Sequence, residues 1–217
     1  MIDLHTHSLF SDGELLPAEL VRRAVVMGYR AVAVTDHADM SNLDFIVPRV
    51  VKACRLLSEA FPITAVGGVE LTHCPPEAIA PLAEEARALG AQIVVVHGET
   101  VVEPVPPGTN RAAVRAAVDI LAHPGLISEE DAAMAAERGV CLELSARRGH
   151  SLTNGHVCRT ARRVGATLIV NTDAHAPSDL ITRETALTVA RGAGLSLQEA
   201  LEVLAGAEDL VRRLVGR

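Results

Sequence analysis

Ile2-Asp3-Leu4-His5-Thr6-His7 opens the chain with a short apolar run that ends in two histidines two residues apart. Near the other end, Asp173-Ala174-His175 follows the apolar run of residues 167–171 in the same way. On an extended strand, residues two apart point to the same face, so both members of each pair can reach one point in space. Imidazoles and carboxylates are ligands of divalent metals. Both ends of the sequence therefore indicate a metal site where strands end.

The rest of the chain alternates short runs of Val, Ile, Ala and Leu with longer segments of helical periodicity. Seven apolar runs have the length and composition of buried strands: residues 2–5, 31–35, 63–69, 92–96, 118–122, 140–144 and 167–171. Near-continuous apolar strands that alternate with helices predict a parallel sheet covered by helices.

Start and stop signals of helices lie between these runs. Prolines suit first turns and glycines suit helix ends, which gives predicted helices at residues 18–27, 77–89, 128–139 and 155–165. The remainder, from about Arg183, also has helical periodicity, and we expect it to wrap around the outside.

Candidate ligands at the strand ends decide between an open sheet and a closed barrel. Six of the seven predicted strand ends carry one or two, namely His5 with His7, His37, Glu70, His97, His123, and Asp173 with His175. Only a closed ring brings so many carboxyl ends around one pocket, because an open sheet spreads them along its edge. We therefore predict an α/β fold that forms a TIM-like (β/α)7 barrel, as a single domain over residues 1–217.

Composition excludes some functional classes. The chain has 217 residues, a formal net charge of −7, and only one Tyr, three Phe and no Trp. An acidic chain with few aromatic side chains lacks the basic surface and the stacking platforms of extended nucleic-acid binding. Its four cysteines show no CxxC spacing, and no basic segment precedes an apolar stretch near the start. No apolar run approaches the roughly 20 residues of a membrane span, so we expect a cytoplasmic protein without a membrane partner.

Several of these segments together resemble one known family. Asp3-Leu4-His5-Thr6-His7-Ser8, Ser11-Asp12-Gly13 and Thr35-Asp36-His37 resemble the opening motifs of the PHP (polymerase and histidinol phosphatase) superfamily. Glu70, His97, His123 and the Asp173–His175 pair then follow in the family's order, so the resemblance extends from residue 3 to residue 175. It implies a distorted (β/α)7 barrel with a trinuclear metal centre that hydrolyses phosphoesters.

The resemblance implies three metal sites made from nine residues. The first would be held by His5, His7, Glu70 and Asp173; the second by a bridging Glu70 with His97 and His123; and the third by Asp12, His37 and His175. It also implies catalytic roles for Glu70, Asp173 and His175, with a hydroxide that bridges the metals as the nucleophile. Judged singly, a histidine at a strand end is more often a packing residue. Nine ligand types in one family's order argue against that reading, and mixed nitrogen and oxygen ligation suits Zn, Mn or Fe.

The loop after the sixth strand carries a basic cluster of Arg147, Arg148 and His150. Arginine binds phosphate with two parallel hydrogen bonds, so these residues are candidates for substrate binding, with a solvated charge pair as the alternative. Arg183 and Arg111 are two further candidates, and Glu143 either supports the site or pairs with an arginine. The irregular segment of residues 98–109 either covers the active-site face or is a rigid surface excursion.

The favoured function is hydrolysis of a phosphomonoester on a small phosphorylated metabolite, as in the histidinol phosphatases that the chain resembles. The main alternative is a nucleotide or oligonucleotide phosphoesterase with the same trinuclear site, such as a 3′,5′-bisphosphate nucleotidase or an exonuclease. An amidohydrolase is disfavoured because it typically expects a carbamylated Lys, and Lys52 is the only lysine. A non-catalytic, metal-bound regulatory domain would not need nine ligands.

Overall fold

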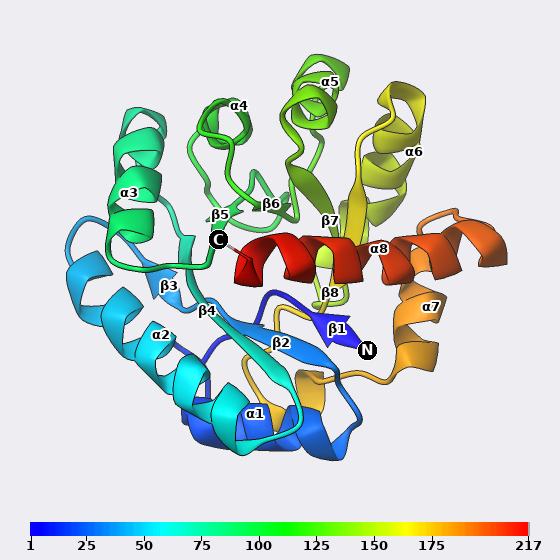
Figure 1. The fold of residues 1–217 in the computed structure, drawn as a ribbon. Coiled ribbons are helices and arrows are strands. Elements are labelled where there is room, and N and C mark those ends of the chain that lie inside the picture. The colour runs from blue at the N-terminus through cyan, green and yellow to red at the C-terminus, as the bar shows by residue number, and fades with distance from the viewer. Residues whose placement is uncertain (217) are drawn as a thin grey trace.

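The computed structural model describes residues 1–216, and in that part of the chain the strands form one parallel sheet that curls into a barrel (Figure 1). Every strand pair is parallel, and the order around the sheet is β1-β2-β4-β5-β6-β7-β8, with β3 also paired to β4. The strands are β1 (Ile2–Asp3), β2 (Ala31–Val34), β3 (His37–Ala38), β4 (Thr64–Leu71), β5 (Ile93–His97), β6 (Ile120–Ala122), β7 (Cys141–Ser145) and β8 (Leu168–Asn171). β2 lies within the predicted strand of residues 31–35 and β3 follows just beyond its end, so each of the seven predicted strands is present in the structure.

The ring closes between its first and last strands through short contacts at their carboxyl ends. Thr6 and Ala174 form an isolated parallel bridge there, beside a hydrogen bond of 2.8 Å from the His7 amide to the Ala174 carbonyl. Closer to the strands, the Asn171 side-chain oxygen accepts the Leu4 amide at 2.9 Å. A side chain thus replaces part of the backbone ladder. The barrel is distorted and nearly closed, which confirms the predicted fold class.

Eight helices in residues 1–216 alternate with these strands. They are α1 (Pro17–Val26), α2 (Leu43–Ala60), α3 (Pro76–Ala88), α4 (Thr109–Arg115), α5 (Glu129–Arg138), α6 (Asn154–Val164), α7 (Arg183–Gly192) and α8 (Leu197–Val215), with short 3-10 segments η1 (His150–Thr153) and η2 (Pro177–Asp179). We did not predict α2, which contains Pro48. Its apolar face, including Ile46 and Val50, is fully buried, and this burial outweighs the backbone hydrogen bond that proline removes.

The helix α8 closes the amino end of the barrel and does not wrap around the outside as expected. In Figure 1 it lies across the ring of strands. Its Ala207, Leu210 and Leu214 join one apolar cluster with inward residues such as Ile2 and Ile93, which begin their strands. Burial of about 25 cal/mol per Å² of apolar surface favours this docking over a solvent-facing position. The amino end is therefore filled, and a site can open only at the carboxyl end.

Two further expectations concern cysteines and membrane spans. All four cysteines, Cys54, Cys74, Cys141 and Cys158, are free and buried. Among the described residues, the helices include none with the length and hydropathy needed to cross a bilayer.

Candidate metal centre

The nine residues implied as ligands lie together at the carboxyl end of the barrel. They come from six strand ends and one loop: His5 and His7 follow β1, Asp12 lies in the next loop, His37 begins β3, Glu70 lies in β4, His97 ends β5, His123 follows β6, and Asp173 and His175 follow β8. Ligand atoms of eight of them form overlapping groups within 4.8 Å, which are His5-His7-Glu70, His5-His123-Asp173 and His7-Asp12-His37-His175. The ninth, His97, groups in the same way with His123 and with His150, which is not one of the nine. The predicted convergence of the pairs that open and close the chain is present in the structure.

Glu70 is at the centre of this cluster. Its fully buried carboxylate lies 3.2 Å from His5 Nε2, 3.6 Å from His7 Nε2 and 2.7 Å from His37 Nδ1. The second carboxylate, Asp173, lies 3.3 Å from His7 Nε2. A carboxylate surrounded by imidazoles of different groups is placed to bridge two cations.

The third group is the most open part of the centre. Asp12 Oδ1 lies 3.1 Å from His175 Nε2 and 3.4 Å from His37 Nε2, and the Asp12 side chain is 57% exposed. The side chains of His5 and Glu70 are 0% exposed. A cation held by Asp12, His37 and His175 would therefore face the incoming substrate.

Unsatisfied polar atoms test whether this centre suits metal ions. Within residues 1–216, six buried side-chain atoms have no hydrogen-bond partner, and all six belong to the nine residues: His5 Nε2, His7 Nδ1 and Nε2, Glu70 Oε1, His97 Nδ1 and His123 Nδ1. Each such atom costs about 1–3 kcal/mol, and native proteins rarely leave one unpaired. Divalent cations bind imidazole nitrogens and carboxylate oxygens, so they would satisfy these atoms, and the residues fit a metal centre.

The pKa values of the buried histidines and carboxylates also bear on whether this centre suits metal ions. Burial lowers the pKa of His7 and of His123 well below the usual value, which leaves neutral imidazoles with free lone pairs. Burial opposes the charged form of His5 as well, but the carboxylates of Glu143 and Glu70 raise its pKa well above normal. Burial raises the pKa of Asp173 to about 7. Burial opposes the charged form of Glu70, but the imidazoles of His5 and His37 hold its pKa well below the usual value, so Glu70 is charged near neutral pH. Asp173 is fully charged there only if a cation neutralises it.

Glu143 in β7 supports the centre from behind. Its Oε1 lies 2.9 Å from His5 Nδ1 and accepts Asn171 Nδ2 at 2.8 Å, while its Oε2 accepts the His123 amide at 3.0 Å. With Nδ1 engaged, His5 directs Nε2 at Glu70. A carboxylate behind a ligating histidine fixes the ring and raises its basicity. Of the two roles considered for Glu143, the structure shows the supporting one.

We expect Glu143→Ala to weaken metal binding about 10- to 100-fold, the usual effect of losing such a partner. Competition of the apoprotein with a zinc-binding dye measures this affinity. Glu59→Ala, on the exposed face of α2, is the matched control and should bind as wild type does. An unchanged affinity in Glu143→Ala would show that His5 needs no such support.

Strained backbone conformations also occur at this end of the barrel. His123, Asp173 and His73 have positive φ angles of 27°, 54° and 53°. A non-glycine residue in this region costs on the order of 1–3 kcal/mol, and such residues gather at functional sites. The left-handed turn at His123 follows β6 directly, and the one at Asp173 lies two residues past the end of β8, so both redirect the chain at the candidate ligands.

The candidate substrate residues are distributed unevenly around the centre. Arg147 is half-buried, donates a hydrogen bond from Nη1 to the Asp173 carbonyl at 3.0 Å, and contacts the His175 ring. It also lines a cavity of about 100 Å³ together with several of the candidate metal ligands. His150 lines the same cavity, whereas Arg148 is exposed and is absent from the described lining. Arg147 is therefore the arginine that the structure places at the centre.

Arg111 and Arg183 lie elsewhere in the fold. Arg111 pairs with Asp131 at 2.7 Å and with Glu130 at 2.8 Å, both on α5. Arg183 is exposed at the start of α7, near the amino group of Met1, whose pKa is lowered by burial and by the charges of Arg30 and Arg183. Neither arginine is among the described residues that line the cavity.

Glu103 is a cavity residue that the sequence did not single out. It lies in the proline-containing segment between β5 and α4, 3.0 Å from His97 Nε2 and 3.2 Å from His73 Nε2. The hydrogen bond from His97 lowers the pKa of Glu103 to about 2. Glu99 anchors the segment by accepting the Gly108 and Asn110 amides at 3.0 and 2.9 Å. Loop length had marked this segment, but no motif marked the residue within it.

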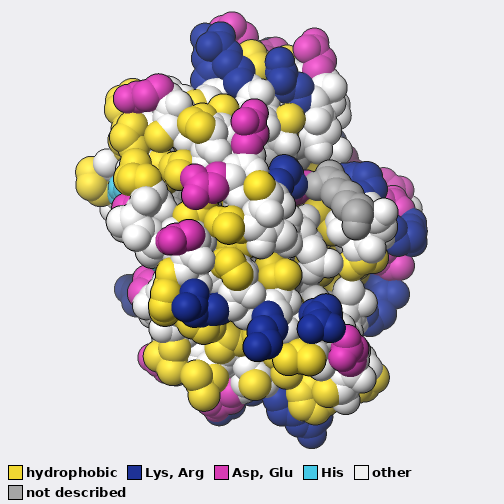
Figure 2. All heavy atoms as spheres, turned by 60° about the vertical axis from the view of Figure 1, so that its left-hand side comes forward, with side chains coloured by type: hydrophobic (Ala, Val, Ile, Leu, Met, Phe, Trp, Pro, Cys, Tyr) yellow, Lys and Arg dark blue, Asp and Glu magenta, His cyan; other side chains and the backbone are white. Residues whose placement is uncertain are grey.

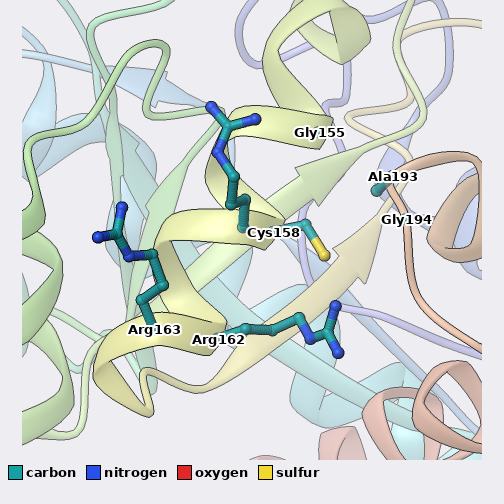
Figure 3. A pocket seen from close by; sticks show the side chains of 7 residues that line it. Gly155, Cys158, Arg162, Arg163, Ala193 and Gly194 are labelled. Carbon is teal, nitrogen blue, oxygen red and sulfur yellow. The ribbon is translucent and has the colours of Figure 1, made fainter.

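A larger hollow of about 510 Å³ lies at the side of the barrel, against α6 (Figure 3). Arg162 and Arg163 line it, and in Figure 3 their side chains point apart. Arg162 pairs with Glu199 at 2.8 Å and Arg163 with Glu129 at 3.5 Å. Because Arg162 and Arg163 point apart and each pairs with a carboxylate, these two arginines do not form a convergent anion site.

A parallel barrel with imidazoles and carboxylates converging at its carboxyl end defines a metal-dependent hydrolase. Residues 3–144 match the PHP domain family, and the chain belongs to that family. Together with its site, this makes the protein a metal-dependent phosphoesterase, as the resemblance in the sequence predicted.

Individual relatives are similar to different extents. An uncharacterized protein of Methanocaldococcus jannaschii is 52% identical over 199 residues, which are 91% of either chain. The DNA polymerase/3′-5′ exonuclease PolX of Bacillus subtilis is 28% identical over 214 residues, which cover 87% of this chain but 36% of PolX. The crystal structure of a histidinol phosphate phosphatase from Lactococcus lactis, complexed with zinc, L-histidinol and phosphate, has a TM-score of 0.64 at 18% identity and covers 90% of this chain and 94% of that one. At that identity the likeness concerns the fold.

Proposed function

We propose that this protein is a phosphomonoesterase that acts on a small phosphorylated metabolite and uses three divalent cations, Zn, Mn or Fe. The observation that carries the proposal is one cavity in which Arg147 lies beside the converging metal residues. A phosphate dianion needs cations and a hydrogen-bond donor around its oxygens, and this cavity is lined by a donor, Arg147, and by residues that would hold cations.

The size of the cavity supports a terminal phosphate as the reacting group. It measures about 100 Å³, well below the roughly 300–1,000 Å³ of sites that enclose a drug-sized molecule. Glu103, from the segment between β5 and α4, narrows its mouth. The phosphoryl group would enter, and the remainder of the substrate would lie outside, against the exposed Val101 and Val102 of the same segment.

Each group of residues has a defined task in this proposal. Glu70, Asp173 and the imidazoles hold the cations, and Glu143 keeps His5 directed at Glu70. Bound divalent cations act as Lewis acids and lower the pKa of a water molecule toward neutrality. Arg147 binds a phosphate oxygen and stabilises the charge that develops during in-line attack. Asp12, at the open side, would hold the third cation together with His37 and His175.

We expect Arg147→Ala to raise KM for a phosphomonoester by about 5- to 150-fold, equivalent to the 1–3 kcal/mol of a charged hydrogen bond. Arg148→Ala is the matched control, because Arg148 is exposed and adjacent in sequence but does not line the cavity. Steady-state kinetics of both variants, with metal content verified, give the comparison. An equal or larger loss in Arg148→Ala would place the phosphate elsewhere.

A nucleotide or oligonucleotide phosphoesterase is the second candidate, because the chain is similar to part of PolX. The net charge of −7 disfavours a long nucleic-acid substrate. On the face drawn in Figure 2, Lys and Arg side chains are scattered among acidic and apolar ones and form no continuous basic surface. A short nucleotide end remains compatible with the small cavity.

A panel of phosphate esters separates these functions. Apoprotein reconstituted with Mn, Zn or Fe is assayed with an aryl phosphate, L-histidinol phosphate, a nucleoside 3′,5′-bisphosphate, a 5′-phosphorylated oligonucleotide and a diaryl phosphodiester. We expect turnover of small monoesters and little turnover of the diester. Preference for the oligonucleotide would favour the second candidate, and no turnover of any ester with any metal would leave a non-catalytic metal-binding protein.

A further inference from the structure

His150 is a buried imidazole at the centre that lies outside the nine-residue set. It begins η1 after β7, and its side chain is 4% exposed. The ring stacks on His123 with centroids 4.0 Å apart and planes 16° from parallel, and it lies 5.8 Å from the ring of His97. Ligand atoms of these three histidines lie within 4.8 Å of one another. Three imidazoles from three different strand ends therefore face one point.

Hydrogen bonding directs one nitrogen of His150 at that point. The hydroxyl of Thr100, itself buried, lies 2.8 Å from Nδ1 and engages that side of the ring. Nε2 points the other way, 3.4 Å from Glu103 Oε1 and 3.8 Å from Asp173 Oδ2. Metal-ligating histidines show this arrangement, with one nitrogen held by a hydrogen bond and the other directed at the ion.

We propose that His150 is a ligand of the second cation, beside His97 and His123. The proposal rests on the proposed function for the existence of that cation and adds a fourth side chain to the three that the family resemblance implies. Glu70, His97, His123 and His150 supply one carboxylate and three imidazoles, and Zn²⁺ binds side chains of both types. The second cation should therefore be held firmly.

Charge distinguishes this role from the binding of substrate phosphate. Two carboxylates, Glu103 and Asp173, face Nε2 of His150. A phosphate dianion at this position would meet both negative groups, whereas a divalent cation would be attracted by them. Arg147, in contrast, presents its guanidinium beside His175 at the open side of the centre. The phosphate site and the His150 site are therefore neighbouring parts of one cavity that meet at Asp173, whose Oδ2 lies 3.7 Å from Arg147 Nε and 3.8 Å from His150 Nε2.

Metal binding by three variants tests this assignment. His150→Ala removes the ligand, Thr100→Val removes the hydroxyl behind it while keeping the shape, and His156→Ala, a histidine in α6 outside the cavity, is the control. Each apoprotein is titrated with Zn²⁺ in competition with a chelating dye, and its cobalt form is examined by visible absorption, whose intensity reports the coordination geometry. Circular dichroism verifies that each variant is folded.

We expect His150→Ala to lose about one equivalent of tightly bound zinc and to show an altered cobalt spectrum. Thr100→Val should keep every equivalent but bind one of them about 10- to 100-fold more weakly, and this variant decides the matter if His150→Ala does not fold. His156→Ala should match wild type. Unchanged zinc affinities and cobalt spectra in both His150→Ala and Thr100→Val would overturn the assignment, and a raised KM alone would make His150 a substrate residue.

The same titration separates this inference from the proposed function. Wild type that binds zinc with the contribution of His150, yet hydrolyses no phosphate ester, would overturn the proposed function and support His150 as a ligand. If wild type hydrolyses esters and His150→Ala still binds its full complement of metal, the proposed function would be supported and the assignment of His150 as a ligand would be overturned. Wild type that binds none of Zn, Mn and Fe would overturn both.

Discussion

Glu70→Gln should reduce phosphomonoesterase activity by at least about 10³-fold, more than His37→Asn does. Removal of one preorganised charge-stabilising group from a hydrolase site costs on the order of 10²–10³-fold. Glu70 has more than one such task, because its carboxylate contacts His5, His7 and His37, which belong to different metal groups. His37 lies only in the third group, and its side chain is 24% exposed.

The physical reason for the difference is charge. Glutamine keeps the shape of Glu70 but removes the negative charge between two cations, which then repel each other in a buried region of low dielectric. At least one cation should be lost or bound more weakly. His37→Asn removes a neutral ligand at the open edge, where water can replace it.

Steady-state rates and metal content of Glu70→Gln, His37→Asn and wild type, all prepared under the same metal conditions, check this result. Excess Mn or Zn should restore His37→Asn more fully than Glu70→Gln. Near wild-type turnover and metal content in Glu70→Gln would show that Glu70 does not bridge two cations.

Removal of the metals should abolish activity and lower Tm by about 10 °C. A ligand present at a thousand times its Kd stabilises the folded state by about 4 kcal/mol. For a chain of this length each kcal/mol shifts Tm by roughly 2–4 °C. The unsatisfied buried atoms of His5, His7 and His123 give the structural reason, because the cations are their missing partners. Calorimetry of the metal-loaded and chelated protein measures the shift, and equal Tm values would argue against an internal metal centre.

The affinity for metals should rise as pH increases through about 7. Burial raises the pKa of Asp173 in the metal-free protein to about 7, so below that pH its carboxyl group holds a proton that the cation must displace. Above pH 7 the Asp173 carboxyl group is already ionised, so its contribution to the pH dependence should level off. His5, whose pKa is raised well above the usual value, still holds a proton there that the cation must displace. Asp173→Asn should lose this step in a zinc titration followed across pH, and a step of equal size in that variant would assign it to another group.

The ligand set could be read from the sequence because each of its members is marked by local pattern. His5 with His7 and Asp173 with His175 follow apolar runs, and a strand end is a local feature of the chain. Once alternation with helices predicts a parallel barrel, all strand ends of one direction must meet at one face. The same logic identified Arg147 but could not distinguish it from Arg148, Arg183 or Arg111.

Sequence by itself thus determined the parallel barrel and the nine candidate ligands, because strand periodicity and strand-end residues are set within a few positions of one another. Tertiary structure alone decided the rest. Glu103 reaches His97, Thr100 engages His150, and Glu143 fixes His5 across 138 positions. The packing of α8 onto the amino end likewise joins residues from both ends of the chain. These contacts depend on how loops fold back once the ring has closed, and no local pattern of apolar or charged residues encodes that geometry.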